Sequence, residues 1–266
     1  MKRTFAGIFL LSACFAGLAA VGWYYVQPAV QMKPEYQITA ENVTVPPPPD
    51  GVPETFVKEV LESAGLHQPG ILLDKTLAKK LADAFAAYPW VETVEQVDLR
   101  YPSGAVIKLS YRKPAAFVAA ANQGRYPVDR NGILLPSDYF ANIAPEKQML
   151  FVTITGIKTA PLGTAGTPWG DPLVQSAAQL ADVLGEDAAK LKLTYITPFA
   201  EETPAGIRIA CKLTTQGKTE IIWGQFAAGD PKNEAKKKRL WELAEQYRSL
   251  DNVPVKFQPV NLSVDK

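Results

Sequence analysis

An uncharged, almost wholly apolar stretch lies at the start of the chain, between Phe5 and Val26, directly after a basic tip of residues 1–4. As a helix it would extend about 33 Å at 1.5 Å per residue, enough to cross a hydrocarbon core about 30 Å thick. We therefore predict a single transmembrane helix over residues 5–26, with its N-terminus in the cytoplasm, because positive residues favour that side. The residues expected to anchor it are Phe5, Leu10, Leu11, Leu18, Val21, Trp23, Tyr24 and Val26.

Two other interpretations of this segment remain open. Residues 16–20 supply the small side chains of a cleavage site, so the segment is also compatible with a secretory signal that is removed. Residues 11–14 resemble a lipobox, which would place a lipid on Cys14. The sequence does not tell whether the segment is retained, cleaved or lipidated, and we favour a retained helix because of its length.

The pattern after the apolar segment predicts a small α+β domain over residues 38–113. Residues 27–37 are polar and form a juxtamembrane spacer, and residues 38–45 alternate as a strand that the prolines at 46–49 end. Apolar residues at three-to-four spacing then predict two helices, one closed by Gly65 and one capped by Asp74. Their expected buried faces are Phe56, Val57, Val60 and Leu61 for the first helix, and Leu77, Leu81, Ala84, Phe85 and Tyr88 for the second.

The period changes from helical to alternating after Pro89. Every second residue is apolar in residues 97–101 and again in residues 107–111, with a Pro-Ser-Gly turn between them. This pattern predicts a hairpin with one buried face. The order strand, helix, helix, strand, strand is then complete, and two helices can cover one face of a three-stranded sheet.

The remaining residues, 114–266, predict a β-rich domain with two helices. One helix ends at Gly185 and the other carries apolar residues between Leu240 and Tyr247. Pro259 lies inside the last predicted strand, which indicates an edge strand because proline cannot donate to a ladder. The predicted strands cover residues 115–121, 125–128, 133–135, 151–156, 191–196, 206–213, 220–223 and 255–264.

Composition and motifs argue against catalysis. Lys and Arg number 28 against 27 for Asp and Glu, so no overall charge draws the chain to nucleic acid. We find no phosphate-binding loop, nucleophile elbow, zinc-protease motif or Cys-x-x-Cys pair, so we expect no enzyme activity, cofactor, metal or small-molecule substrate. The basic run at residues 236–239 is expected to form a solvated helix face, with contact to anionic lipid headgroups as the alternative.

Several short motifs, in shared order and spacing, resemble the FtsQ/DivIB family of bacterial cell-division proteins. They are Gly-Ile-Leu-Leu-Asp at 70–74, Pro-Trp-Val at 89–91, Tyr-Pro-Ser-Gly at 101–104, Arg-Lys-Pro-Ala-Ala at 112–116, Val-Asp-Arg-Asn-Gly at 128–132 and Phe-Val-Thr-Ile-Thr-Gly at 151–156. The resemblance implies a POTRA domain at 38–113 and the family's β domain at 114–266. It also implies a non-enzymatic scaffold for septum assembly in the bacterial inner membrane, with its bulk in the periplasm and FtsB/FtsL-type single-pass proteins as partners. The alternative function is a periplasmic POTRA-containing assembly or chaperone module, or a lipoprotein of envelope biogenesis.

The last strand is the candidate partner site. An edge strand can accept an added strand through its backbone, and we expect Phe257, Val260 and Leu262 to supply apolar contacts with Trp223 nearby. The alternative is that these residues complete the core of their own domain. The closing residues 260–263 read Val-Asn-Leu-Ser, which departs from the family's more charged pattern.

Overall fold

The computed structural model describes residues 15–26, 33, 37–49, 52–66, 74–100, 103–120, 124–137, 150–204, 206–254, 257 and 259–262. The chain divides into two compact units. The N-terminal unit comprises Met1–Pro49 and Pro53–Ser110, and the C-terminal unit comprises Asp50–Val52 and Tyr111–Lys266. The division after Ser110 lies close to the domain boundary predicted at residue 113.

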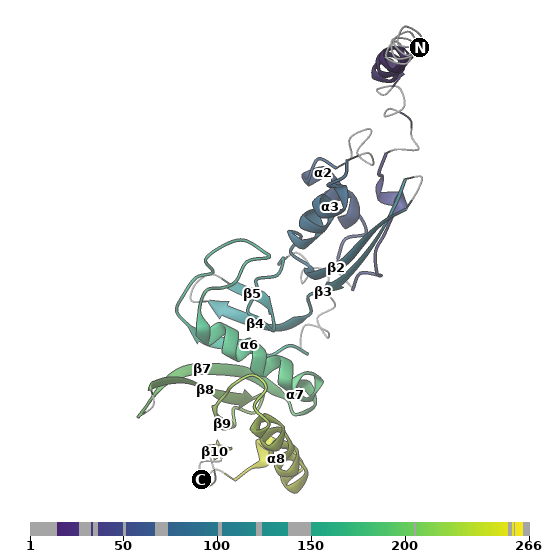
Figure 1. Cartoon of the computed structure of the whole chain (residues 1–266). Coiled ribbons are helices and arrows are strands. Elements are labelled where there is room, and N and C mark those ends of the chain that lie inside the picture. The colour runs from purple at the N-terminus through teal and green to yellow at the C-terminus, as the bar shows by residue number, and fades with distance from the viewer. Residues whose placement is uncertain are drawn as a thin grey trace. The chain divides into compact units, whose positions relative to one another are not determined.

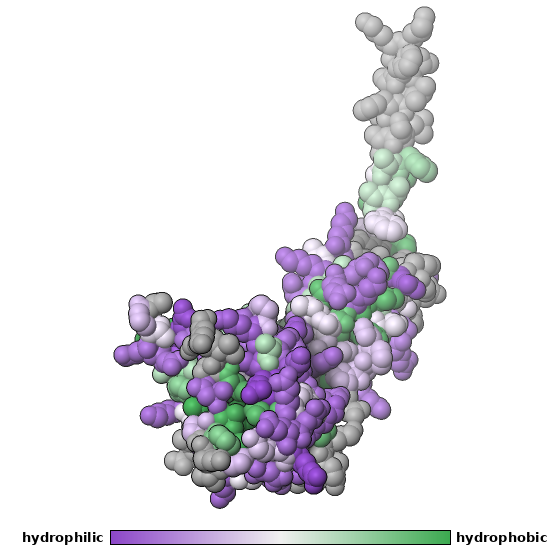
Figure 2. All heavy atoms as spheres, turned by 90° about the horizontal axis from the view of Figure 1, so that it is seen from below, coloured by the Kyte–Doolittle hydropathy of each residue, from purple (hydrophilic) through white to green (hydrophobic). Residues whose placement is uncertain are grey.

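The prediction of a transmembrane helix is not confirmed by the structure. In the described part of the chain, no helix is both long enough and apolar enough to cross a membrane. Residues 15–26 form a helix. Its residues are largely apolar (Figure 2). Of the predicted anchor residues, Leu18, Val21, Trp23, Tyr24 and Val26 are exposed on this helix, and Phe5, Leu10 and Leu11 lie outside the described residues.

The N-terminal unit is an α+β fold built on a three-stranded sheet (Figure 1). Its strand order is β1-β3-β2, and β1 runs parallel to β3 with Val43 opposite Ala105. The elements in chain order are β1 (Val43–Thr44), α2 (Phe56–Ser63), α3 (Leu77–Ala86), β2 (Val91–Arg100) and β3 (Gly104–Tyr111). The strand predicted at residues 38–45 is therefore shorter than expected, because Ala40–Asn42 form a turn of 3-10 helix, η2, before it.

The core of this unit follows the predicted helical faces. All four apolar residues predicted for α2 are buried, and so are Leu77, Leu81 and Phe85 of α3. Phe56 meets Phe85 edge to face, with ring centroids 6.3 Å apart. Alternate residues of β3 are buried as predicted, whereas Leu99 of β2 is exposed.

The C-terminal unit contains a seven-stranded mixed sheet in its described part, with the order β10-β9-β8-β7-β6-β4-β5. Pairs joined by hairpins are antiparallel, whereas β4 with β6, β6 with β7 and β9 with β10 are parallel. Parallel neighbours require a crossover, which α6 provides before β7 and α8 before β10. The strands are β4 (Pro114–Ala120), β5 (Gly124–Asp129), β6 (Thr153–Ile157), β7 (Leu193–Thr203), β8 (Gly206–Thr215), β9 (Glu220–Gln225) and β10 (Val260–Asn261).

The helices of this unit are α6 (Pro172–Leu184), α7 (Glu186–Lys190) and α8 (Lys232–Tyr247). Asp171 caps α6 by accepting a hydrogen bond from the Leu173 amide at 2.9 Å, and Pro172 occupies the first turn, where no amide donor is needed. The short helix α7 was not expected from the sequence. Its five residues are too few to show a helical repeat.

One hydrophobic core joins α6 and α8 to the same face of the sheet. Strand residues that point toward these helices include Val118, Ile154, Ile196, Leu213 and Trp223, all buried in one cluster with the helices. Because successive strand residues alternate in direction, their neighbours Thr153 and Tyr195 lie on the opposite face. The two helices predicted for this domain therefore cover a single face of the sheet.

Candidate functional site

The candidate site lies where the C-terminal sheet ends, at β9 and β10. Val260 pairs with Ile221 in a parallel register, and the Leu262 amide donates to the Ile222 carbonyl at 2.8 Å. In the described part of the chain, β10 is the outermost strand on this side. The strand predicted over residues 255–264 is thus much shorter in the described residues, and it begins directly after Pro259.

The four predicted contact residues fall into two groups. Trp223, Val260 and Leu262 are buried in the core of their own unit. Phe257 is 53% exposed and lies just before β10. A partner at this edge would therefore meet the side chain of Phe257 and the backbone of the strand, rather than the side chains of the other three residues.

The basic run at residues 236–239 lies close to this edge. It is not the fully solvated helix face that the sequence predicts. Lys236 is only 5% exposed: its Nζ donates to the Gln225 carbonyl at 2.9 Å and lies 5.6 Å from the centroid of the Trp223 ring. Lys237 pairs with Asp187 of α7 at 2.8 Å. Two of the four basic residues therefore hold α8 to the sheet and to α7. The spacing of Lys236 from Leu240 and Leu243 is a helical repeat that places all three on one face, and this signal could have been read from the sequence.

These contacts also set the protonation of nearby groups. The hydrogen bond from Lys237 lowers the pKa of Asp187, so the carboxylate stays ionised opposite its partner. Burial raises the pKa of Cys211 on β8 to about 12, although the charge of Lys236 acts in the opposite direction. Since thiol reactivity requires the thiolate, Cys211 is an inert core residue near neutral pH.

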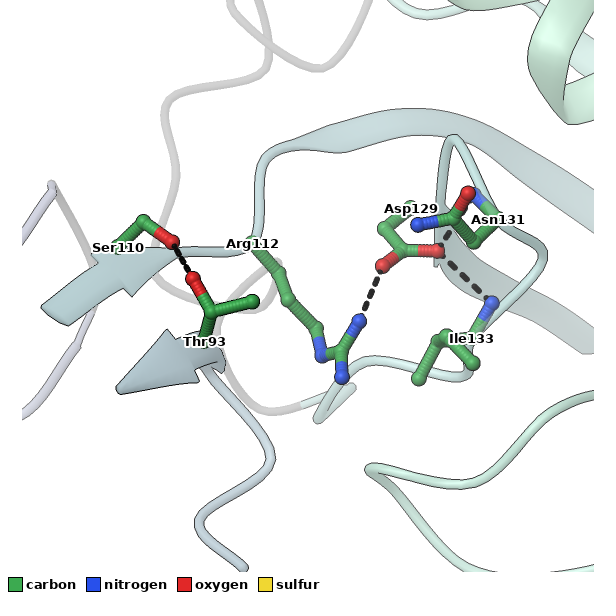
Figure 3. A network of polar contacts seen from close by, with 6 residues as sticks. All are labelled: Thr93, Ser110, Arg112, Asp129, Asn131 and Ile133. Carbon is green, nitrogen blue, oxygen red and sulfur yellow. Dashed lines mark hydrogen bonds and ion pairs between the residues drawn. The ribbon is translucent and has the colours of Figure 1, made fainter. Parts of the chain in front are cut away.

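A second polar cluster supports the turn after β5 (Figure 3). Arg112 donates to Oδ2 of the buried Asp129 at 2.8 Å, while Oδ1 accepts from the amides of Asn131 and Ile133 at 2.8 and 2.9 Å. The carboxylate thus has a charged partner and two backbone donors, which compensate its burial. Arg112 and Asp129 come from two of the quoted motifs, and the cluster joins the entry to β4 with the turn after β5.

Gly132 completes that turn in a left-handed conformation, with φ of +71°. A Cβ at this position would lie 3.2 Å from the Cα of Gln175 on α6. The glycine therefore allows both the backbone conformation and the close approach to the helix. In the N-terminal unit, the hydroxyls of Thr93 and Ser110 lie 2.6 Å apart across β2 and β3 (Figure 3).

The described residues contain no group of three or more His, Cys, Asp or Glu side chains placed to hold a metal ion. The sole histidine, His67, and the Gly-Ile-Leu-Leu part of the motif at 70–73 lie outside the described residues. Neither models of known protein families nor curated proteins match this sequence.

Proposed function

We propose that this protein is a non-enzymatic scaffold of bacterial cell division that works outside the cytoplasm and binds FtsB/FtsL-type division proteins. The order of motifs resembling the FtsQ/DivIB family supports the proposal. Pro89 and Trp90 lead directly into β2, Lys113 precedes β4, and Asp129 ends β5. The motifs therefore occur at the boundaries of elements, where a shared fold would require them.

The observation that carries the proposed binding mode is the position of β10 at the end of the C-terminal sheet. An outermost strand can accept a partner strand through main-chain hydrogen bonds, and such pairing tolerates changes of side chain. The exposed ring of Phe257 lies beside this edge and offers an apolar anchor. We therefore expect partner binding to depend on Phe257 and on the backbone of β10.

A binding experiment with a matched control tests this mode. The full chain, its Phe257→Asp variant and its Ile207→Asp variant are titrated with the purified extracytoplasmic part of an FtsB/FtsL-type protein from the same organism. Ile207 on β8 is 75% exposed and lies away from β10 in the sheet, so its variant controls for a general effect of added charge. We expect Phe257→Asp to weaken binding at least tenfold and Ile207→Asp to leave it unchanged, with equal thermal stability. Equal binding by all three proteins, or an equal loss in both variants, would refute the site.

Depletion of the protein tests the cellular role separately. Filamentous cells without septa are the expected result for a division scaffold. Normal division with defective outer-membrane proteins would instead support the assembly-module function and contradict the proposal. A reporter fused after Lys33 should be active only outside the cytoplasm, and cytoplasmic activity would contradict the proposed compartment.

A further inference from the structure

The face of the C-terminal sheet that lies opposite α6 and α8 carries a groove of about 680 Å³. It lies over β5, β4, β6 and the start of β7, on the side of the sheet away from the edge at β10. Its volume lies in the range typical of pockets that bind drug-sized ligands. Its lining includes Arg125, Phe151, Thr153, Thr155, Lys192 and Tyr195.

The groove has a one-sided charge. Arg125 and Lys192 both line it, and no Asp or Glu is among the described residues that do so. Thr153, Thr155 and Tyr195 add hydroxyl groups to the residues that line it. A ligand that carries carboxylates would therefore meet cations and hydrogen-bond donors without repulsion from acidic groups.

Arg125 is held in a defined position by its neighbours. Its guanidinium carbon lies 4.4 Å from the centroid of the Phe117 ring, and its Nη2 donates to Oγ1 of Thr153 at 3.0 Å. Thr153 is itself only 7% exposed, so the contact is anchored in the sheet. A guanidinium has five N–H donors, which leaves donors for a carboxylate in the groove.

Lys192 enters the groove from a constrained backbone. Its φ is +55°, a left-handed conformation that costs free energy for a residue with a side chain. The conformation is held by hydrogen bonds of the Lys192 amide to the Ala189 carbonyl at 3.0 Å and of the Gln216 amide to the Lys192 carbonyl at 2.9 Å. Within the described parts of the chain, its ammonium has no ion-pair partner.

Aromatic surface completes the groove. Tyr195 is 43% exposed and Phe151 is half-buried, so both rings offer contact area to a ligand. Phe151 also packs edge to face on Phe117, which ties it to the ring beneath Arg125. Cationic and aromatic groups thus lie along one hollow surface.

We propose that this groove binds an acidic, extended segment of a partner polypeptide, whose carboxylates contact Arg125 and Lys192 and whose apolar side chain contacts Tyr195 and Phe151. Protein segments that bind anionic lipid headgroups usually carry clusters of four to eight Lys or Arg residues. This groove has two cations and is lined partly by aromatic rings, so a short acidic peptide fits it better than a lipid surface does. The site is independent of the proposed scaffold role and of β10, so failure of one leaves the other standing.

The test is fluorescence anisotropy of a fluorescein-labelled peptide, Glu-Glu-Phe-Glu-Glu-Leu, titrated with the full chain. We expect Arg125→Gln and Lys192→Gln each to weaken binding about tenfold, as for loss of one charge-assisted contact. Arg125→Lys should retain more binding than Arg125→Gln, and Tyr195→Ala should weaken it. Lys238→Gln, which removes an exposed cation of α8 outside the groove, should bind like the unaltered chain.

Four results would overturn the proposal. They are unchanged binding by both groove variants, an equal loss in Lys238→Gln, equal binding of the peptide Lys-Lys-Phe-Lys-Lys-Leu, and no binding by the unaltered chain. Phosphatidylglycerol vesicles form the second arm. If vesicles bind and Arg125→Gln and Lys192→Gln remove that binding, while the peptide does not bind, the site recognises lipid headgroups instead. Thermal unfolding of each variant checks that the groove remains folded.

Discussion

Arg112 donates to the carboxylate of Asp129 at 2.8 Å, and both side chains are largely removed from solvent. The same carboxylate also fixes two backbone amides of the turn after β5. Breaking one partner of such a pair leaves a buried charge without compensation, which costs far more than breaking an exposed pair.

We therefore predict that Asp129→Ala destabilises the C-terminal unit by about 3–5 kcal/mol. The matched control is Arg239→Ala, which breaks the exposed pair of Arg239 with Glu242 and should cost no more than about 1 kcal/mol. Denaturant unfolding followed by tryptophan fluorescence measures both changes, because Trp223 and Trp169 are buried in this unit. Similar losses in the two variants would contradict the role assigned to Asp129.

Two lysines of the basic run, Lys236 and Lys238, should respond differently to substitution. Lys236→Ala removes the donor to the Gln225 carbonyl and the alkyl chain beside Trp223, so we expect a loss of about 2 kcal/mol in the free energy of unfolding. Lys238→Ala removes an exposed side chain and should change stability by no more than about 0.5 kcal/mol. Equilibrium denaturation of the two variants gives the comparison. If Lys236→Ala were as stable as Lys238→Ala, the basic run would be a solvated face after all.

The buried thiol of Cys211 predicts a pH dependence of stability. Its pKa is raised to about 12 in the folded state, whereas an unfolded thiol ionises near pH 8.5–9. A raised folded pKa means that the stabilising contribution is complete below pH 8.5 and is lost as the pH rises toward 12. Between pH 9 and 10.5 we expect the free energy of unfolding to fall by up to about 1.4 kcal/mol per pH unit from this group.

Cys211→Ala is the control for that slope, since it should remove the thiol contribution and leave other titrations in place. Tyr88 in the N-terminal unit, whose pKa burial also raises to about 12, makes a separate contribution above pH 10. In a Cys14→Ser background, a thiol reagent at pH 8 should label Cys211 only after unfolding. Rapid labelling of the native protein would show that Cys211 is accessible.

The sequence alone determined most of the secondary structure, because local periodicity and turn residues carry that information. The apolar faces of α2, α3 and α6 could be read from their spacing, and Gly185 marked the C-terminal end of α6. The change to an alternating pattern after Pro89 located β2 and β3. The α+β class of the folded units followed from this order.

Hydrophobicity alone was a poor guide at both ends of the chain. The apolar segment at residues 5–26 predicts a spanning helix, but no helix among the described residues is long enough and apolar enough to cross a membrane. The closing strand is predicted over residues 255–264, and in the described part Val260–Asn261 pair with β9. Pairing requires a neighbouring strand in register, and the sequence of one strand does not specify its neighbour.

The candidate surfaces were decided by tertiary structure. Whether Trp223 and Val260 are core residues or contacts depends on α8 crossing over the sheet, which brings together residues far apart in the chain. The groove requires Arg125, Thr153, Lys192 and Tyr195, which come from three separate segments and form no linear motif. Local patterns determine which elements form, whereas long-range packing determines which of their side chains meet and which remain exposed.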